Sequence, residues 1–148
     1  MPRALSPESE KEFDELTGFL HFYLVECKSN SAALVEQSAA EIVEKYGRGK
    51  ALVGLRQATN DAMEELADAR DEAVALLDRA LTERGLVSFS ELRRRYSARY
   101  RRLLKRGSIR SDTEFYLVSG IVSEVSTKIP GEELAQLQRM IEAYERDA

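Results

Sequence analysis

The stretch from Lys50 to Arg84 decides the fold, and it reads KALVGLRQATNDAMEELADARDEAVALLDRALTER. Small and apolar residues recur in it at alternating intervals of three and four, which places them along one face of a helix. They are Leu52, Leu55, Thr59, Ala62, Leu66, Ala69, Ala73, Leu76 and Ala80. This heptad-type spacing predicts one long central helix over about residues 50–84, packed along its length on a partner, with Gly85 as its stop signal.

Two further helices are expected before this stretch. Ser6 suits the N-cap of the first helix and Pro7 its first position, and an apolar stripe then continues to Cys27, which we interpret as a small core residue. A second helix is expected over roughly residues 32–46. Gly47 should end it, because glycine accepts the positive φ that closes a last turn.

Three more helices are expected after Gly85. Ser88 and Ser111 each precede a glutamate by three residues, the spacing of a capping box. The first box opens a helix that runs to Arg106, the second opens a helix with valines on its inner face, and the last helix begins near Gly131. The sequence therefore predicts an all-α bundle of about six helices in one domain, residues 1–148, with a subdivision, if any, near residues 85–88.

The composition of the chain indicates the cellular compartment in which we expect the protein. Hydrophobic residues make up 43% of the chain, enough for a core. No stretch approaches the roughly 18 apolar residues that a membrane span needs, and the first residues lack the apolar core of a secretion signal. Cys27 is the single cysteine, so no internal disulfide can form. We therefore expect a cytoplasmic protein.

Basic residues cluster between Arg93 and Arg110. This segment contains no acid, although the net charge of the whole chain is −4. Such a helix can bind phosphates or an acidic protein. The candidate partner-binding residues are Arg93, Arg94, Arg95, Arg99, Arg101, Arg102, Lys105 and Arg106. A protein partner is favoured over nucleic acid, because the pI is near 5.2. Alternatively, these side chains form a solvated face that pairs with acids of the helix over 50–84.

Carboxylates form a second pattern. Glu41-Ile42-Val43-Glu44 lies on the second expected helix, and Glu65-Leu66-Ala67-Asp68 lies on the third. The pattern resembles the Glu-x-x-Glu and Glu-x-x-Asp motifs of the all-α, MazG-like nucleotide pyrophosphohydrolases, over about residues 32–81. The resemblance implies that Mg²⁺ is held by Glu41, Glu44, Glu65 and Asp68, and that the metal activates water and binds a triphosphate. On the other interpretation these acids form a solvated helix face.

Other catalytic patterns are not supported. His21 is the single histidine and lies six positions from Cys27, too far along one helix for a direct hydrogen bond. We therefore expect a non-enzymatic interaction or regulatory protein without a cofactor, such as an adaptor, antitoxin or immunity-type protein. It would recognise a protein partner through charge-complementary helices and form a homodimer through the helix over 50–84. The Mg²⁺-dependent hydrolase is the first alternative, and nucleic-acid binding by the helix over 92–106 is the second.

Overall fold

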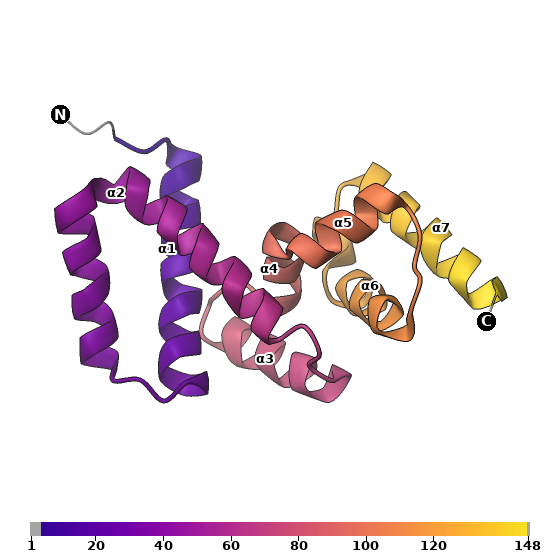
Figure 1. The fold of residues 1–148 in the computed structure, drawn as a ribbon, viewed down its shortest axis with the longest axis horizontal. Helices are drawn as coiled ribbons and strands as arrows, with labels where there is room; N and C mark the ends of the chain where they lie inside the picture. The colour runs from indigo at the N-terminus through magenta and orange to yellow at the C-terminus, as the bar shows by residue number, and fades with distance from the viewer. Residues whose placement is uncertain (1–3, 148) are drawn as a thin grey trace.

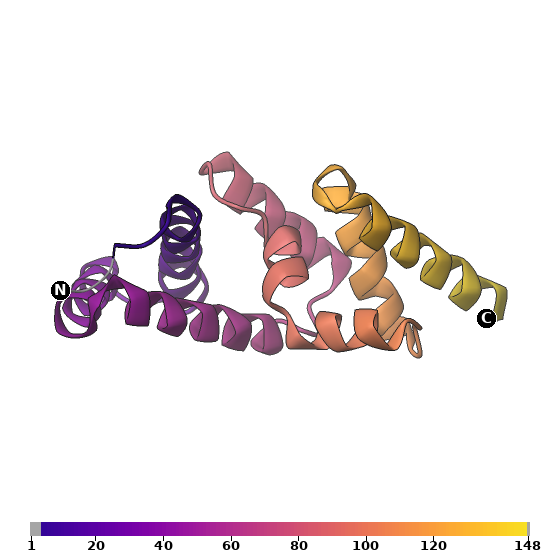
Figure 2. The same ribbon diagram turned by 90° about the horizontal axis from the view of Figure 1, so that it is seen from above.

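The computed structural model describes residues 4–147, and every regular element within them is helical (Figure 1). This confirms the all-α bundle. The molecule is elongated, with α1 and the first half of α2 at one end and α7 at the other (Figure 2). Among the described residues, no helix combines the length and the apolarity needed to cross a bilayer.

Helix α1 spans Pro7–Phe22 and begins as expected, since the Ser6 hydroxyl accepts a hydrogen bond of 3.1 Å from the amide of Ser9. A π-helical turn, Tyr23–Cys27, follows. Contrary to the prediction, Cys27 is exposed. The reason is that a π turn advances the chain by a different angle from an α turn, so residues beyond it leave the buried stripe.

Helix α2 spans Ala32–Glu65 and bends sharply at Gly47, where φ is 85° and ψ is 165°. This conformation is open essentially to glycine alone. The predicted break at Gly47 is therefore confirmed, but as a kink between two helical halves. We call the first half, residues 32–46, the arm. The second half, residues 48–65, crosses α1 and packs on it (Figure 1).

The long helix is present as α2, but the single helix expected over 50–84 is wrong. The chain leaves helical conformation after Glu65, and α3 begins at Asp71 and ends at Glu83. The break changes the buried face: Val74 and Leu81 are buried, whereas the seam residue Leu76 is 63% exposed. Small seam residues beyond Leu66 offer little apolar surface, and re-orienting α3 buries its larger residues against α4 instead.

The helix expected from Ser88 to Arg106 is divided as well. Helix α4 spans Phe89–Tyr96 and α5 spans Ala98–Arg106. Ser97 lies between them in extended conformation, and its hydroxyl accepts a hydrogen bond of 3.1 Å from the amide of Tyr100. The serine therefore caps a new helix rather than continuing the old one.

The C-terminal helices agree with the prediction. Helix α6 spans Asp112–Val125, a 3-10 turn covers Ser126–Lys128, and α7 spans Gly131–Asp147. Buried apolar residues form two clusters, one from α1 to α4 and one from α5 to α7. Helix α4 joins them because it packs on both α3 and α6. Along the chain, the two clusters meet at Ser97.

Candidate functional site

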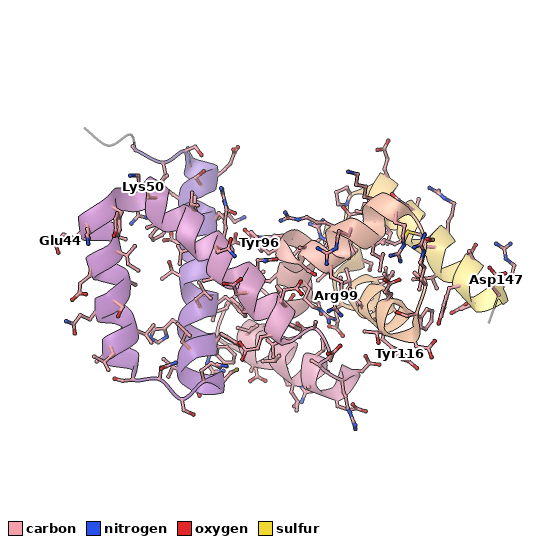
Figure 3. The ribbon with its side chains drawn as sticks, in the orientation of Figure 1. Glu44, Lys50, Tyr96, Arg99, Tyr116 and Asp147 are labelled. Atoms are coloured by element: carbon pink, nitrogen blue, oxygen red, sulfur yellow. The ribbon has the colours of Figure 1, made fainter. Side chains whose placement is uncertain are left out.

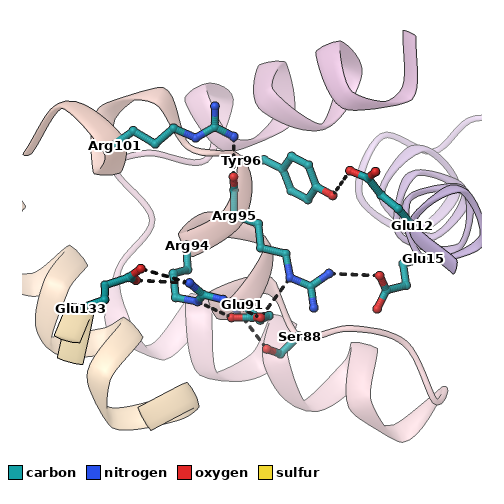
Figure 4. Close-up of polar contacts among 9 residues, drawn as sticks. All are labelled: Glu12, Glu15, Ser88, Glu91, Arg94, Arg95, Tyr96, Arg101 and Glu133. Carbon is teal, nitrogen blue, oxygen red and sulfur yellow. Dashed lines mark hydrogen bonds and ion pairs between the residues drawn. The ribbon is translucent and has the colours of Figure 1, made fainter. Parts of the chain in front are cut away.

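Some of the basic residues between Arg93 and Arg110 form ion pairs within the molecule. Glu91 is only 2% exposed, and its two carboxylate oxygens accept hydrogen bonds from Arg94 Nε at 2.7 Å and Arg95 Nε at 3.0 Å (Figure 4). Burial alone would raise the pKa of Glu91, but the two guanidinium groups outweigh it and lower the pKa. Arg94 and Arg95 therefore hold the fold together.

The same arginines reach other helices. Arg94 Nη1 lies 3.2 Å from Glu133 on α7, and Arg95 Nη1 lies 3.0 Å from Glu15 on α1 (Figure 4). Tyr100 donates a hydrogen bond of 2.8 Å to Glu133. The sequence-based alternative of internal pairing thus applies to Arg94 and Arg95, with acids from α1, α4 and α7.

The other candidate basic residues have different surroundings. Arg93 is buried, and Arg99 Nη1 lies 3.9 Å from Asp68. Four side chains on α5 face solvent: they are Arg101, Arg102, Lys105 and Arg106. Arg101 donates to the carbonyl of Arg95, and Arg106 pairs with Glu114. In residues 4–147, Arg102 and Lys105 form no ion pair within 4.0 Å. The structure therefore does not gather the eight candidates into one surface.

The four carboxylates of the Mg²⁺ hypothesis are also not brought together. Glu41 and Glu44 are both exposed on the arm, and Figure 3 shows Glu44 at one end of the molecule. Glu65 lies at the other end of the second half of α2, roughly 27 Å from the kink at 1.5 Å per residue. It accepts hydrogen bonds from Tyr23 and Lys28. Within the described residues, no group of three or more histidine, cysteine or acidic side chains has the arrangement of a metal site.

A mainly apolar concavity lies elsewhere, between α1 and the arm. It has a volume of about 870 Å³, two walls and a base. One wall comes from α1 and includes Phe13 and Leu20, and the base comes from the second half of α2 and includes Leu55. The arm supplies the remaining wall with Leu34, Val35, Ala39, Ile42 and Val43. We call this concavity the groove.

The arm makes little hydrophobic contact with the rest of the described chain: Val43 packs on the N-terminal cluster but is only partly buried. None of residues 32–46 is buried, and Leu34, Ile42 and Tyr46 are 63%, 47% and 52% exposed. Polar contacts hold the arm at its two ends. Arg48 Nε donates a hydrogen bond of 3.2 Å to Glu10 on α1, and His21 Nε2 lies 3.6 Å from Glu36. The arm therefore faces the groove without filling it.

The sequence predicted the helix over residues 32–46 and its end at Gly47, but not that its apolar residues line a groove. The signal that could have revealed the groove is Gly47, because a kink there turns the arm away from the second half of α2. Comparisons with protein-family models, with curated proteins and with solved structures return no match for this chain. Its function is therefore inferred from the surfaces described above.

Proposed function

We propose that this chain is a protein-interaction module whose groove binds an amphipathic helix, and that this helix is the arm of a second copy. The observation that carries the proposal is the apolar face of the arm, which lines the groove and remains exposed. Grooves of this kind bind helices through apolar side chains spaced three and four apart. Val35, Ala39 and Ile42 line the groove from the arm at spacings of four and three.

An unpaired arm is energetically unfavourable. Isolated helices of up to about 15 residues are marginal in water, and helices in proteins gain most of their stability from burial of an apolar face. Residues 32–46 are near that length and bury no side chain. Burying Leu34 or Ile42 fully would contribute about 1.5–3 kcal/mol each. A partner that covers this face therefore stabilises the arm as well as binding it.

A second copy fits the groove because the arm supplies both the missing helix and one wall of the site. If the arm of one chain enters the groove of another, the second arm can enter the first groove by the same two-fold rotation. Such an isologous contact closes at two copies and leaves no open groove. The seam expected to form a dimer does not compete, since Leu52, Thr59 and Ala62 are already buried inside the chain.

The experiment is sedimentation equilibrium of the full chain and of two variants. Leu34→Glu should convert the dimer into a monomer, because it places a charge in the groove of the partner. Leu76→Glu is the matched control, since Leu76 is also 63% exposed but lies on α3 outside the groove. A monomeric wild type, or equal loss of dimer in both variants, would contradict the proposal.

A second candidate function is recognition of an acidic protein by α5. The supporting observation is that Ala98–Arg106 contains no acid and that Arg102 and Lys105 are exposed on it. Reversal of both to Glu should abolish binding to an acidic protein without affecting the fold, as neither takes part in the ion pairs of α4. Binding to duplex DNA with a steep salt dependence would instead favour the nucleic-acid alternative.

A further inference from the structure

Arg93 on α4 is an unusual arginine. It is only 5% exposed, and its Nε is buried without a hydrogen-bond partner among the described residues. The guanidinium lies over the ring of Phe89, at 4.9 Å from the ring centroid. Its neighbours Arg94 and Arg95 both form ion pairs, whereas Arg93 forms none within 4.0 Å in residues 4–147. An unpaired buried charge is costly, so the position demands an explanation.

Nearby acids do not supply the missing acceptor. The buried Asp78 is one of the acids whose charge acts on Arg93, but its two oxygens accept hydrogen bonds from the amide and hydroxyl of Ser90, at 2.8 and 2.6 Å. The oxygens of the buried Glu91 accept from Arg94 and Arg95. Burial lowers the pKa of Arg93, and the charges of Asp78 and Asp71 offset this only in part. The guanidinium therefore keeps donors available for another group.

Arg93 lines a cavity of about 340 Å³, at the lower end of the volumes of small-molecule sites. The cavity lies between the turn after α2, the start of α3 and one side of α6. Helix α3 begins here without a side-chain hydrogen bond at its N-cap residue Arg70. Thr113 and Tyr116 of α6 add hydroxyl groups to the lining. The lining thus includes several hydrogen-bond donors for an anionic group.

The rest of the lining selects against a highly charged anion. Asp68, Asp71 and Glu72 are all exposed carboxylates around the same cavity, and apart from Arg93 they are accompanied by one cation in the lining, Arg70. Three negative charges repel a phosphate dianion, whereas they attract an ammonium group. A ligand that carries one carboxylate and one ammonium group a short distance apart matches both parts of the lining.

We infer that this cavity binds a small zwitterion of the α-amino-acid class, with its carboxylate on the guanidinium of Arg93 and its ammonium toward Asp68, Asp71 and Glu72. A guanidinium and a carboxylate can form two parallel charge-assisted hydrogen bonds. This site does not depend on the groove, and it uses none of the residues that line the groove.

The test is NMR of ¹⁵N-labelled protein, following the Nε–Hε signal of Arg93. The chain is titrated separately with a panel of L-amino acids, with acetate, with methylamine and with inorganic phosphate. We expect at least one amino acid to shift this signal at a lower concentration than acetate or phosphate. Asp71→Asn should weaken the binding of that amino acid about tenfold, because one charge-assisted hydrogen bond is lost, and it should leave acetate binding unchanged. Glu83→Gln, an exposed acid at the far end of α3, is the matched control.

Three results would overturn the inference. The Arg93 signal could remain unchanged with every amino acid of the panel. Phosphate could bind more tightly than any amino acid, which would make the site a simple anion site. Asp71→Asn and Glu83→Gln could change the affinity for the amino acid equally, which would show that Asp71 does not bind its ammonium group. Before the titrations, circular dichroism of both variants checks that each retains the helical fold.

Discussion

The hydroxyl of Tyr96 on α4 donates a hydrogen bond of 2.6 Å to Glu12 on α1 (Figure 4). Arg56 on α2 donates to the same carboxylate, at 2.6 and 3.0 Å. Burial raises the pKa of Tyr96, and the bond to Glu12 raises it further, so the phenol remains a donor at neutral pH. Three helices that are distant in sequence therefore meet at one acidic side chain.

Removing this donor should destabilise the N-terminal cluster. We expect Tyr96→Phe to lower the free energy of unfolding by about 1 kcal/mol, because Glu12 loses a hydrogen bond but keeps Arg56. Tyr116→Phe is the matched control, since Tyr116 is 54% exposed and has no hydrogen-bond partner for its hydroxyl among the described residues. Urea unfolding measures both changes. Equal effects of the two substitutions would show that the hydroxyl of Tyr96 contributes nothing specific.

We expect Glu91 to contribute more to the free energy of unfolding than an exposed acid does. Glu91→Gln preserves the shape but removes the charge that Arg94 and Arg95 share, and we expect a loss of about 1–3 kcal/mol in the free energy of unfolding. The exposed Glu132 on α7 is the control, and its change to Gln should stay within about 0.5 kcal/mol. Urea unfolding at neutral pH compares them, and similar values would contradict a central position for Glu91.

Acidification should destabilise the fold through the same carboxylates. The pKa values of Glu12 and Glu91 are lower in the folded chain than the ordinary 4.5. A group with a depressed folded pKa stabilises the protein above its unfolded pKa, and that stabilisation is lost as the pH falls through the folded pKa. Thermal unfolding should therefore show stability declining as the pH falls below about 4.5. Glu91→Gln should flatten this decline, and an unchanged slope would contradict the assignment.

Gly47 sets the angle of the arm. A Cβ at φ 85° and ψ 165° is strained, so we expect Gly47→Ala to lower the free energy of unfolding by about 1–3 kcal/mol and to weaken the proposed dimer. Gly49→Ala is the control, because a Cβ at that helical position meets no atom within 4 Å. It should be neutral or stabilise by up to about 1 kcal/mol. Sedimentation and unfolding measurements distinguish the two, and equal behaviour would mean that the kink is not required.

Local signals allowed several of the helix boundaries to be predicted, although not the breaks after Glu65 and at Ser97. Ser6, Ser88 and Ser111 each accept a hydrogen bond from the amide three residues ahead, as their positions in the sequence suggested. Gly85 ends α3 with φ 72°, and the amide of Leu86 bonds to the carbonyl of Leu81. Capping depends on residues within one turn, so it can be read without knowledge of the tertiary fold.

Long-range relationships could not be predicted in the same way. The spacing from Leu52 to Leu76 continues without interruption, and nothing in it reveals that the helix ends at Glu65 or that α3 buries a different face. The pairs of Arg95 with Glu15 and of Arg94 with Glu133 join residues far apart in sequence. Only the ion pairs of Glu91 could have been predicted, because Glu91 precedes Arg94 and Arg95 by three and four positions, the spacing of helical ion pairs.

The measurement that tests the central claim most directly is an isotope-filtered NOE experiment on a mixture of labelled and unlabelled chains. Contacts are detected only between a labelled copy and an unlabelled one. We expect intermolecular signals between the methyl groups of Ile42 on the arm and Leu20 on α1, because each arm lies in the groove of the other copy. Intermolecular signals that are absent, or that involve only residues outside the groove, would contradict the account.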